Sequence, residues 1–138
     1  MYYLCKNKTT GMKIEKLNGT NKRLYQLIAP LAMNSTVVKQ NGGVPITTSG
    51  SHTWYVAIEK KKVVGFLSLV GGSIRHDYHN DAKVFDQLLR NLMSDNPGLT
   101  LRYVSSSSEM PIVEQLGFVV EKTSKNYFYV KYEQKKGL

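Results

Sequence analysis

The sequence predicts an α+β domain with a mixed, mostly antiparallel sheet and helices on both of its faces. The first observation is the order of elements between Trp54 and Lys131, which runs strand, strand, strand, helix, strand, helix, strand, strand. The second is length, because 138 residues without an internal repeat or an interdomain linker suit one domain with its own core. We therefore expect residues 12–138 to form a single domain and the polar residues 1–11 to form a flexible extension.

The first third of the chain predicts one strand and two helices. Apolar and polar residues alternate over residues 12–17, as in a half-buried strand. Thr20 or Asn21 can cap the next helix, because a short polar side chain accepts a hydrogen bond from an unpaired backbone N–H. Pro30 lacks that donor, so we expect the helix to end or kink just before it. A second helix is expected from Pro30 towards Lys39.

The middle of the chain predicts a long loop and then three strands. Residues 40–53 are rich in Gly, Ser, Thr and Asn, and such a long loop is a candidate wall of a substrate site. The runs 53–59 and 62–70 read as a hairpin with Lys60 and Lys61 in its turn. The second run is almost entirely apolar, which is typical of a central strand buried on both faces. Residues 73–78 form a third, unusually polar run.

The clearest helix of the sequence follows this third run. Its apolar residues recur at helical spacing and would face the sheet: Val84, Phe85, Leu88, Leu89, Leu92 and Met93. Residues 95–98, Asp-Asn-Pro-Gly, are expected to end the helix.

The last third predicts a strand, a short helix and a closing hairpin. Residues 99–104 are the expected strand and residues 109–116 the helix, which Gly117 can end in a left-handed conformation. Residues 118–121 and 127–133 then pair as a hairpin. We expect its second strand, with alternating aromatic residues, to lie half-buried at the edge of the sheet.

Composition narrows the possible functions. Nineteen Lys and Arg against ten Asp and Glu give a formal charge of +9, which favours anionic partners such as phosphorylated cofactors or nucleic acid. One cysteine, no run of about twenty apolar residues and no signal-peptide pattern lead us to expect a cytoplasmic protein without membrane contact. The sequence has no zinc-ligand spacing, no GxxxxGK[ST] loop and no G-x-S-x-G elbow, so we expect no metal ion.

Residues 112–118, Ile-Val-Glu-Gln-Leu-Gly-Phe, link the last helix to the β-rich tail. With the order of elements, this segment resembles the GCN5-related N-acetyltransferase (GNAT) family, whose last helix often ends in a "YEKLGF"-like run. The resemblance implies an enzyme that transfers acetyl from acetyl-CoA to the amine of a small molecule or peptide. The alternative is an inactive module of the same fold that binds an anionic partner such as nucleic acid.

The resemblance also indicates a cofactor site at the start of the long helix. In the family, a glycine-containing loop of pattern Q/R-x-x-G-x-G/A binds the pyrophosphate of acetyl-CoA through backbone N–H groups. Aligned on the leucine pair of the helix, this loop falls on Asn80, Asp81, Ala82, Lys83, Val84 and Phe85. Lys83 and Phe85 stand where the family has glycines. The other interpretation is that Asn80 or Asp81 simply caps an amphipathic helix.

The four serines before the last helix have two interpretations as well. The resemblance implies that Ser105 and Ser106 flank the pantetheine arm of coenzyme A. Alternatively, Ser107 or Ser108 caps the helix and the remaining serines form a turn.

Candidate catalytic residues lie on the polar third strand. His76, Asp77 and Tyr78 are titratable, and histidine has the side chain whose usual pKa is nearest neutrality. The family's tyrosine in the last helix falls on Val113, which cannot donate a proton. His76 can equally be a packing or surface residue.

Overall fold

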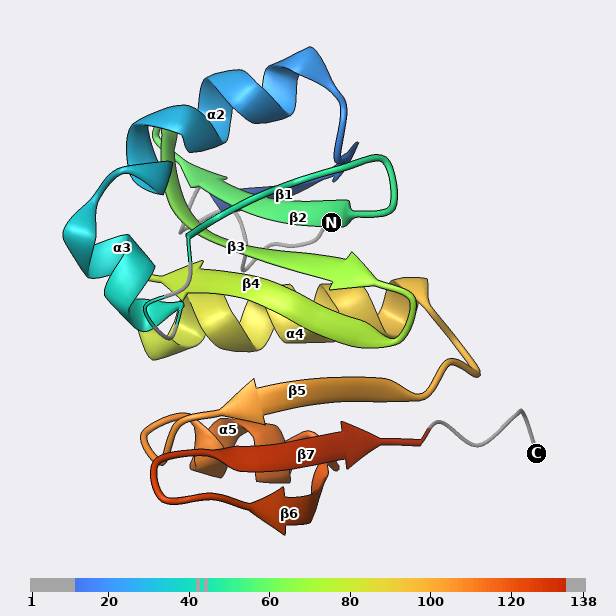
Figure 1. Cartoon of the computed structure of the whole chain (residues 1–138). Coiled ribbons are helices and arrows are strands. Elements are labelled where there is room, and N and C mark those ends of the chain that lie inside the picture. The colour runs from blue at the N-terminus through green and yellow to red at the C-terminus, as the bar shows by residue number, and fades with distance from the viewer. Residues whose placement is uncertain (1–11, 42, 44, 134–138) are drawn as a thin grey trace.

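The computed structural model describes residues 12–41, 43 and 45–133 (Figure 1). The predicted extension, residues 1–11, lies outside the described residues. The strands are β1 (Met12–Asn18), β2 (Thr53–Glu59), β3 (Lys62–Val70), β4 (Ser73–His79), β5 (Leu101–Ser105), β6 (Val119–Thr123) and β7 (Phe128–Tyr132). The helices are α2 (Lys22–Ala32), α3 (Ser35–Gln40), α4 (Ala82–Asp95) and α5 (Met110–Gln115).

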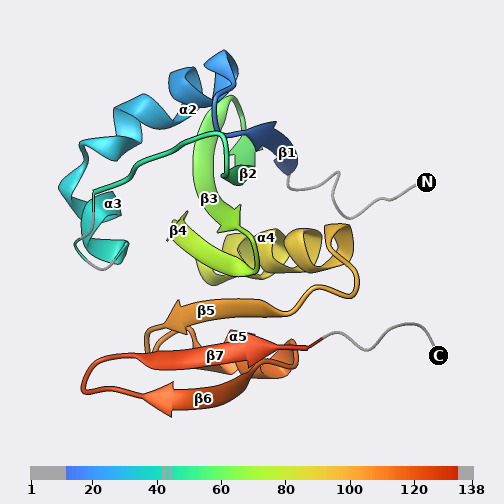
Figure 2. The same ribbon diagram turned by 45° about the vertical axis from the view of Figure 1, so that its right-hand side comes forward.

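Within the described residues, the strands form one seven-stranded sheet in the order β1-β2-β3-β4-β5-β7-β6. Every neighbouring pair is antiparallel except β4 and β5, which are parallel. These two strands share one registered pair, Ser73 with Arg102, next to a hydrogen bond of 2.7 Å from the Arg102 N–H to the Gly72 carbonyl. Beyond this point β4 and β5 move apart (Figures 1 and 2). The predicted α+β class is confirmed.

Helices cover both faces of the sheet. One buried cluster joins α4 and α5 to the sheet, and a second joins α2 and α3 to the opposite face of β2 and β3. The predicted inner face of α4 is confirmed, since four of its side chains are 0% exposed: Phe85, Leu88, Leu89 and Leu92. The run 62–70 is the central strand β3, with six consecutive buried residues.

Gly65 determines how closely α4 approaches β3. A Cβ atom at this position would lie 2.7 Å from the Tyr78 carbonyl oxygen and 2.7 Å from Val84 Cγ1. Both distances are shorter than real contacts, so a larger residue would push the start of α4 away from the sheet. Gly65 therefore helps to place the N-terminus of α4 beside the end of β4.

The structure corrects the predicted helix end before Pro30 and the predicted start of the second helix at Pro30. Helix α2 continues through Pro30 to Ala32, and the second helix begins at Ser35. Pro30 lies in the last turn, where a lost backbone bond disturbs little of the helix. Asn34 starts the next helix by accepting hydrogen bonds from the N–H groups of Thr36 and Val37. No helix in the described part of the chain is both long and apolar enough to cross a membrane.

Two further corrections concern the C-terminal third. The predicted edge strand, β7, lies between β5 and β6, and β6 forms the edge with all five residues exposed. The helix after the serines begins at Met110 with Glu109 at its cap position, and neither Ser107 nor Ser108 caps it. Gly117 ends that helix with a φ of 104°, as predicted.

Candidate active site

The divergence of β4 and β5 opens a cavity of about 350 Å³ between them. Its walls come from the end of α3, from β4 and β5, from the segment before α5, and from β7. The lining residues are Gln40, Asn41, Ile74, Arg75, Asp77, Tyr103, Val104, Ser106, Glu109, Tyr127 and Tyr129. Two carboxyl groups, three phenol groups and one guanidinium thus face a single space.

Asp77 from β4, Tyr103 from β5 and Glu109 from the start of α5 meet at this cavity. The Tyr103 hydroxyl oxygen lies 2.9 Å from Asp77 Oδ2 and 2.9 Å from Glu109 Oε1. A backbone N–H, that of Ser106, also donates to Glu109 Oε1 at 3.1 Å. All three side chains belong to buried residues. We call Asp77, Tyr103 and Glu109 the carboxyl cluster.

Burial controls the proton affinity of this cluster. Removal from water, and secondly the charge of Glu109, raise the pKa of Asp77 well above its usual range. The same burial and the two nearby carboxylates raise the pKa of the Tyr103 hydroxyl. The Tyr103 hydroxyl has one proton and cannot donate it fully to both carboxylates. A proton on Asp77 therefore relieves the repulsion between Asp77 and Glu109. Burial and the neighbouring carboxylate therefore favour an exchangeable proton on Asp77.

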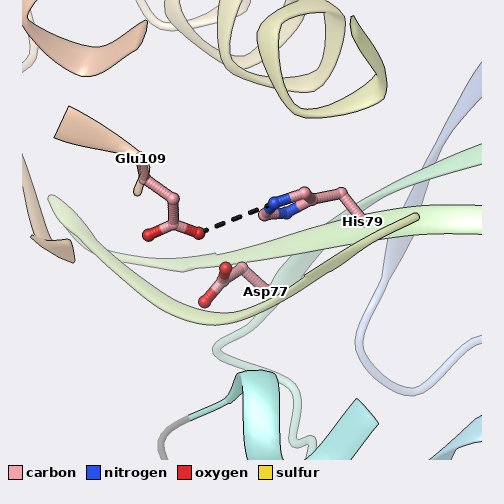
Figure 3. A group of neighbouring side chains, drawn as sticks. All are labelled: Asp77, His79 and Glu109. Atoms are coloured by element: carbon pink, nitrogen blue, oxygen red, sulfur yellow. Dashed lines mark ion pairs between the residues drawn. The ribbon is translucent and has the colours of Figure 1, made fainter. Parts of the chain in front are cut away.

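His79 extends the cluster from the same strand as Asp77 (Figure 3). Its Nε2 lies 3.8 Å from Glu109 Oε2, and its ring stacks on Phe85 with 4.6 Å between ring centroids. Burial lowers the pKa of His79, although Glu109 and Asp81 act in the opposite direction. Asp77, His79 and Glu109 each present a ligand atom within 4.8 Å of the others, a grouping of metal-ligand types that no spacing in the sequence indicates.

The structure separates the three predicted catalytic residues. His76 stacks on His52 and Trp54, and Asn41 Nδ2 lies 2.9 Å from its Nδ1, on the α2 and α3 side of the sheet. Tyr78 packs on Phe66 on that side as well. Asp77 points to the opposite side, because side chains alternate along a strand.

Burial also lowers the pKa of His76, with further contributions from the charges of His52 and Arg75. Its ring therefore stays neutral in a packed stack of aromatic rings. Of the predicted three, Asp77 is the one that lines the cavity and joins the carboxyl cluster.

Asp81 caps helix α4. Its Oδ1 accepts hydrogen bonds from the N–H groups of Lys83 at 2.8 Å and Val84 at 3.1 Å, and its carbonyl accepts one from Phe85. The side chain of Phe85 is fully buried. A second cavity, of about 440 Å³, adjoins this helix start, and its lining includes residues 81–84 together with Ile112 and Gln115 of α5.

The two predicted serines differ in their surroundings. Ser105 is fully buried, and its hydroxyl donates to the Ser106 carbonyl at 3.0 Å. Ser106 lines the cavity between β4 and β5 and holds Glu109 through its backbone N–H. Asn80 is exposed, and its N–H donates to Val64.

Sequence reasoning did not select Tyr103, Glu109 or His79 as site residues. A signal existed for two of them. His79 follows Asp77 by two residues, so a strand places both on one face. Tyr103 lies on the buried face of β5 together with Leu101 and Ser105, where a polar hydroxyl requires a partner.

Solved structures match the fold of this chain, whereas no protein-family model and no curated protein sequence matches it. The structure of Escherichia coli ElaA matches with a TM-score of 0.67 and 13% identity, over 88% of this chain and 99% of that one. The chain has the GNAT fold. An acyl-CoA N-acyltransferase from Pseudomonas aeruginosa matches this GNAT-fold chain with a TM-score of 0.64 and 13% identity, over 89% and 99% of the two chains.

A third match is the Campylobacter jejuni N-acetyltransferase PseH in complex with acetyl coenzyme A. Its TM-score is 0.54 and its identity 14%, over 90% of this chain and 99% of that one. At such low identity the likeness establishes the GNAT fold of this chain. Its activity depends on the residues of its own site.

Proposed function

We propose that this protein is an N-acyltransferase that transfers an acetyl or other acyl group from acyl-CoA to an amine. The observation that carries the proposal is the buried carboxyl cluster in the cavity between β4 and β5. Clusters that hold an exchangeable proton next to a cavity suit general acid and base catalysis. The fold shared with PseH, whose structure contains acetyl coenzyme A, supports the choice of co-substrate.

The cavity suits an acceptor that carries an amine. Amines are mostly protonated at neutral pH, and Glu109 and Asp77 supply negative or acceptor oxygens at the buried end. Tyr127 and Tyr129 supply aromatic surface, against which a cation or an apolar group can pack. Arg75 adds a positive charge to the lining. The acceptor is a small molecule or the amine of a peptide.

The reaction needs a base before it needs an acid. Glu109 is fixed by Tyr103 and by the Ser106 N–H, and it is placed to take a proton from the acceptor ammonium group. The amine nitrogen then bonds to the thioester carbonyl carbon, and the carbon–sulfur bond breaks with its electron pair on sulfur. The nitrogen loses its second proton, and the thiolate gains one. Asp77, whose pKa is raised by burial and by the charge of Glu109, is the acid of the cluster that we assign to supply this proton.

The start of α4 is the proposed site for the phosphates of acyl-CoA. Helix N-termini attract anions, and the side chain of Lys83 adds a positive charge beside the cavity of about 440 Å³. The Asp81 carboxylate already accepts from two of the backbone donors there and repels an anion. We therefore assign the phosphates to Lys83 and the cavity wall, with Ser106 nearer the thioester end.

Calorimetric titration with acetyl-CoA, followed by acetyl transfer assays on a panel of small amines and peptides, tests the proposal. The Glu109→Gln variant should lose activity by about 100- to 10,000-fold, the usual contribution of a general base. Glu114→Gln, an exposed change in the same helix, is the matched control and should keep wild-type activity. If acetyl-CoA does not bind and no amine is acylated, the proposal is wrong.

A further inference from the structure

The edge of β4 that faces β5 carries backbone groups that no strand in the described part of the chain covers. Tyr78 pairs with Phe66 of β3, and the Asn80 N–H donates to the Val64 carbonyl, so these residues point their backbone towards β3. Asp77 and His79 alternate with these residues along β4, so their backbone N–H and C=O groups point away from β3. Strand β5 has already diverged from β4 at this level, since their registered pair is at Ser73.

Two side-chain amides of α3 and its cap bind this open edge. Gln40 Nε2 donates to the His79 carbonyl at 3.0 Å, and Gln40 Oε1 accepts from the His79 N–H at 2.9 Å. Asn41 Oδ1 accepts from the Asp77 N–H at 3.2 Å. The Gln40 amide thus offers one donor and one acceptor to the same residue, as a neighbouring strand would.

The open edge has the direction that an acyl-CoA molecule requires. Its His79 end adjoins the start of α4, where we place the phosphates, and its Asp77 end belongs to the carboxyl cluster. The arm between the phosphates and the thioester of acyl-CoA contains two secondary amides. An extended chain of amides binds an exposed strand edge through main-chain hydrogen bonds.

We propose that Gln40 is an internal competitor of acyl-CoA: its amide closes the edge of β4 at His79 and must leave before the amide arm can pair there. This inference rests on the proposed function. Asn41 stays in place, because it is buried and also hydrogen-bonds His76. Gln40 is exposed at the last position of a six-residue helix, so its side chain can rotate away without disturbing the core.

The competition lowers apparent affinity. If the edge is open for only a fraction of the time, the apparent dissociation constant rises by the inverse of that fraction. Removing the Gln40 amide should therefore tighten acyl-CoA binding by about three- to tenfold, the range that one net hydrogen bond supports. Ligands without the amide arm should bind with the same affinity whether or not the Gln40 amide is present.

The test compares acetyl-CoA with adenosine 3′,5′-bisphosphate, which lacks the arm, by calorimetry on three proteins. These are the wild type, Gln40→Ala, and Thr36→Ala as a neutral exposed control in the same helix. We expect tighter acetyl-CoA binding in Gln40→Ala alone and equal binding of the bisphosphate in all three. In NMR spectra of the wild type, acetyl-CoA should shift the Gln40 side-chain amide signals, whereas the bisphosphate should leave them in place.

The outcomes separate the two proposals. Equal or weaker acetyl-CoA binding in Gln40→Ala, with measurable binding to the wild type, overturns the role of Gln40 and leaves the acyltransferase proposal standing. Absence of acetyl-CoA binding in all three proteins overturns both. Binding to Gln40→Ala without detectable binding to the wild type supports both.

Discussion

The carboxyl group of Asp77, which we propose as the acid of the reaction, also affects the stability of the fold. In the folded protein its pKa lies well above the ordinary value of 3.8, because it is buried beside Glu109. Between these two pKa values the folded protein holds a proton that the unfolded chain has released. The stability that this proton contributes is therefore fully present below pH 3.8 and is lost as the pH rises through the raised pKa.

We predict that Asp77→Asn removes this loss. The wild type should become less stable than the variant as the pH rises from 5 to 8, by at most about 1.4 kcal/mol per pH unit. His79, whose pKa burial lowers, acts in the opposite direction but is present in both proteins. Urea unfolding at three pH values measures the difference between them. Parallel pH profiles would show that Asp77 is not held protonated.

The charges at the start of α4 give a second prediction. Asp81→Asn keeps a capping side chain but removes a negative charge, so acetyl-CoA should bind equally or more tightly. Lys83→Glu should weaken binding by about tenfold, since it reverses a charge beside the phosphate cavity. Lys122→Glu, the same charge reversal on exposed strand β6, is the control. If all three variants bind acetyl-CoA like the wild type, the start of α4 is only a helix cap.

At the scale of elements, α4 is the helix that holds the two sides of the site together. Leu89 is fully buried on its inner face, in the cluster that contains residues from both β3 and β5. Leu89→Ala should lower the free energy of unfolding by about 2–5 kcal/mol. Asn91→Ala, an exposed change in the same helix, should alter it by less than about 0.5 kcal/mol. Chemical denaturation measures both, and similar small losses would mean that Leu89 is not a core residue.

Many helices and strands could be predicted from the sequence because local patterns determine them. The apolar spacing of α4, the hairpin turn at Lys60 and Lys61 and the ending of α5 at Gly117 follow from short-range rules. The continuation of α2 past Pro30 was missed, because the last turn of a helix tolerates a lost bond.

The position of β7 between β5 and β6 was missed for a different reason. Strand order depends on pairing with residues distant in the sequence, and the aromatic alternation of β7 does not specify a partner. The carboxyl cluster was missed for the same reason. Asp77, Tyr103 and Glu109 come from three elements, and only the parallel arrangement of β4 and β5 brings them together.

At the scale of the whole molecule, the formal charge of +9 is the basis of the alternative function, a module that binds nucleic acid. A module that binds nucleic acid should lose affinity linearly on a log–log plot against salt concentration. We expect at most weak binding at low salt and none near physiological ionic strength, because no nucleic-acid motif accompanies the charge. Fluorescence anisotropy with single- and double-stranded DNA and RNA measures this. Specific, tight binding at physiological salt would favour the alternative over the enzyme.

The single registered pair between β4 and β5 leads us to expect two cooperative units in unfolding. Strands β1 to β4 form one continuous hydrogen-bonded ladder, and β5, β7 and β6 form another. The two ladders meet at Ser73 and Arg102, share the hydrogen bond from Tyr103 to Asp77, and are joined by side-chain packing around α4. Native-state hydrogen exchange should therefore show amides of β5 and β7 opening together, at a lower free energy than those of β3. We therefore expect the protein to open first along the place where substrate is proposed to bind.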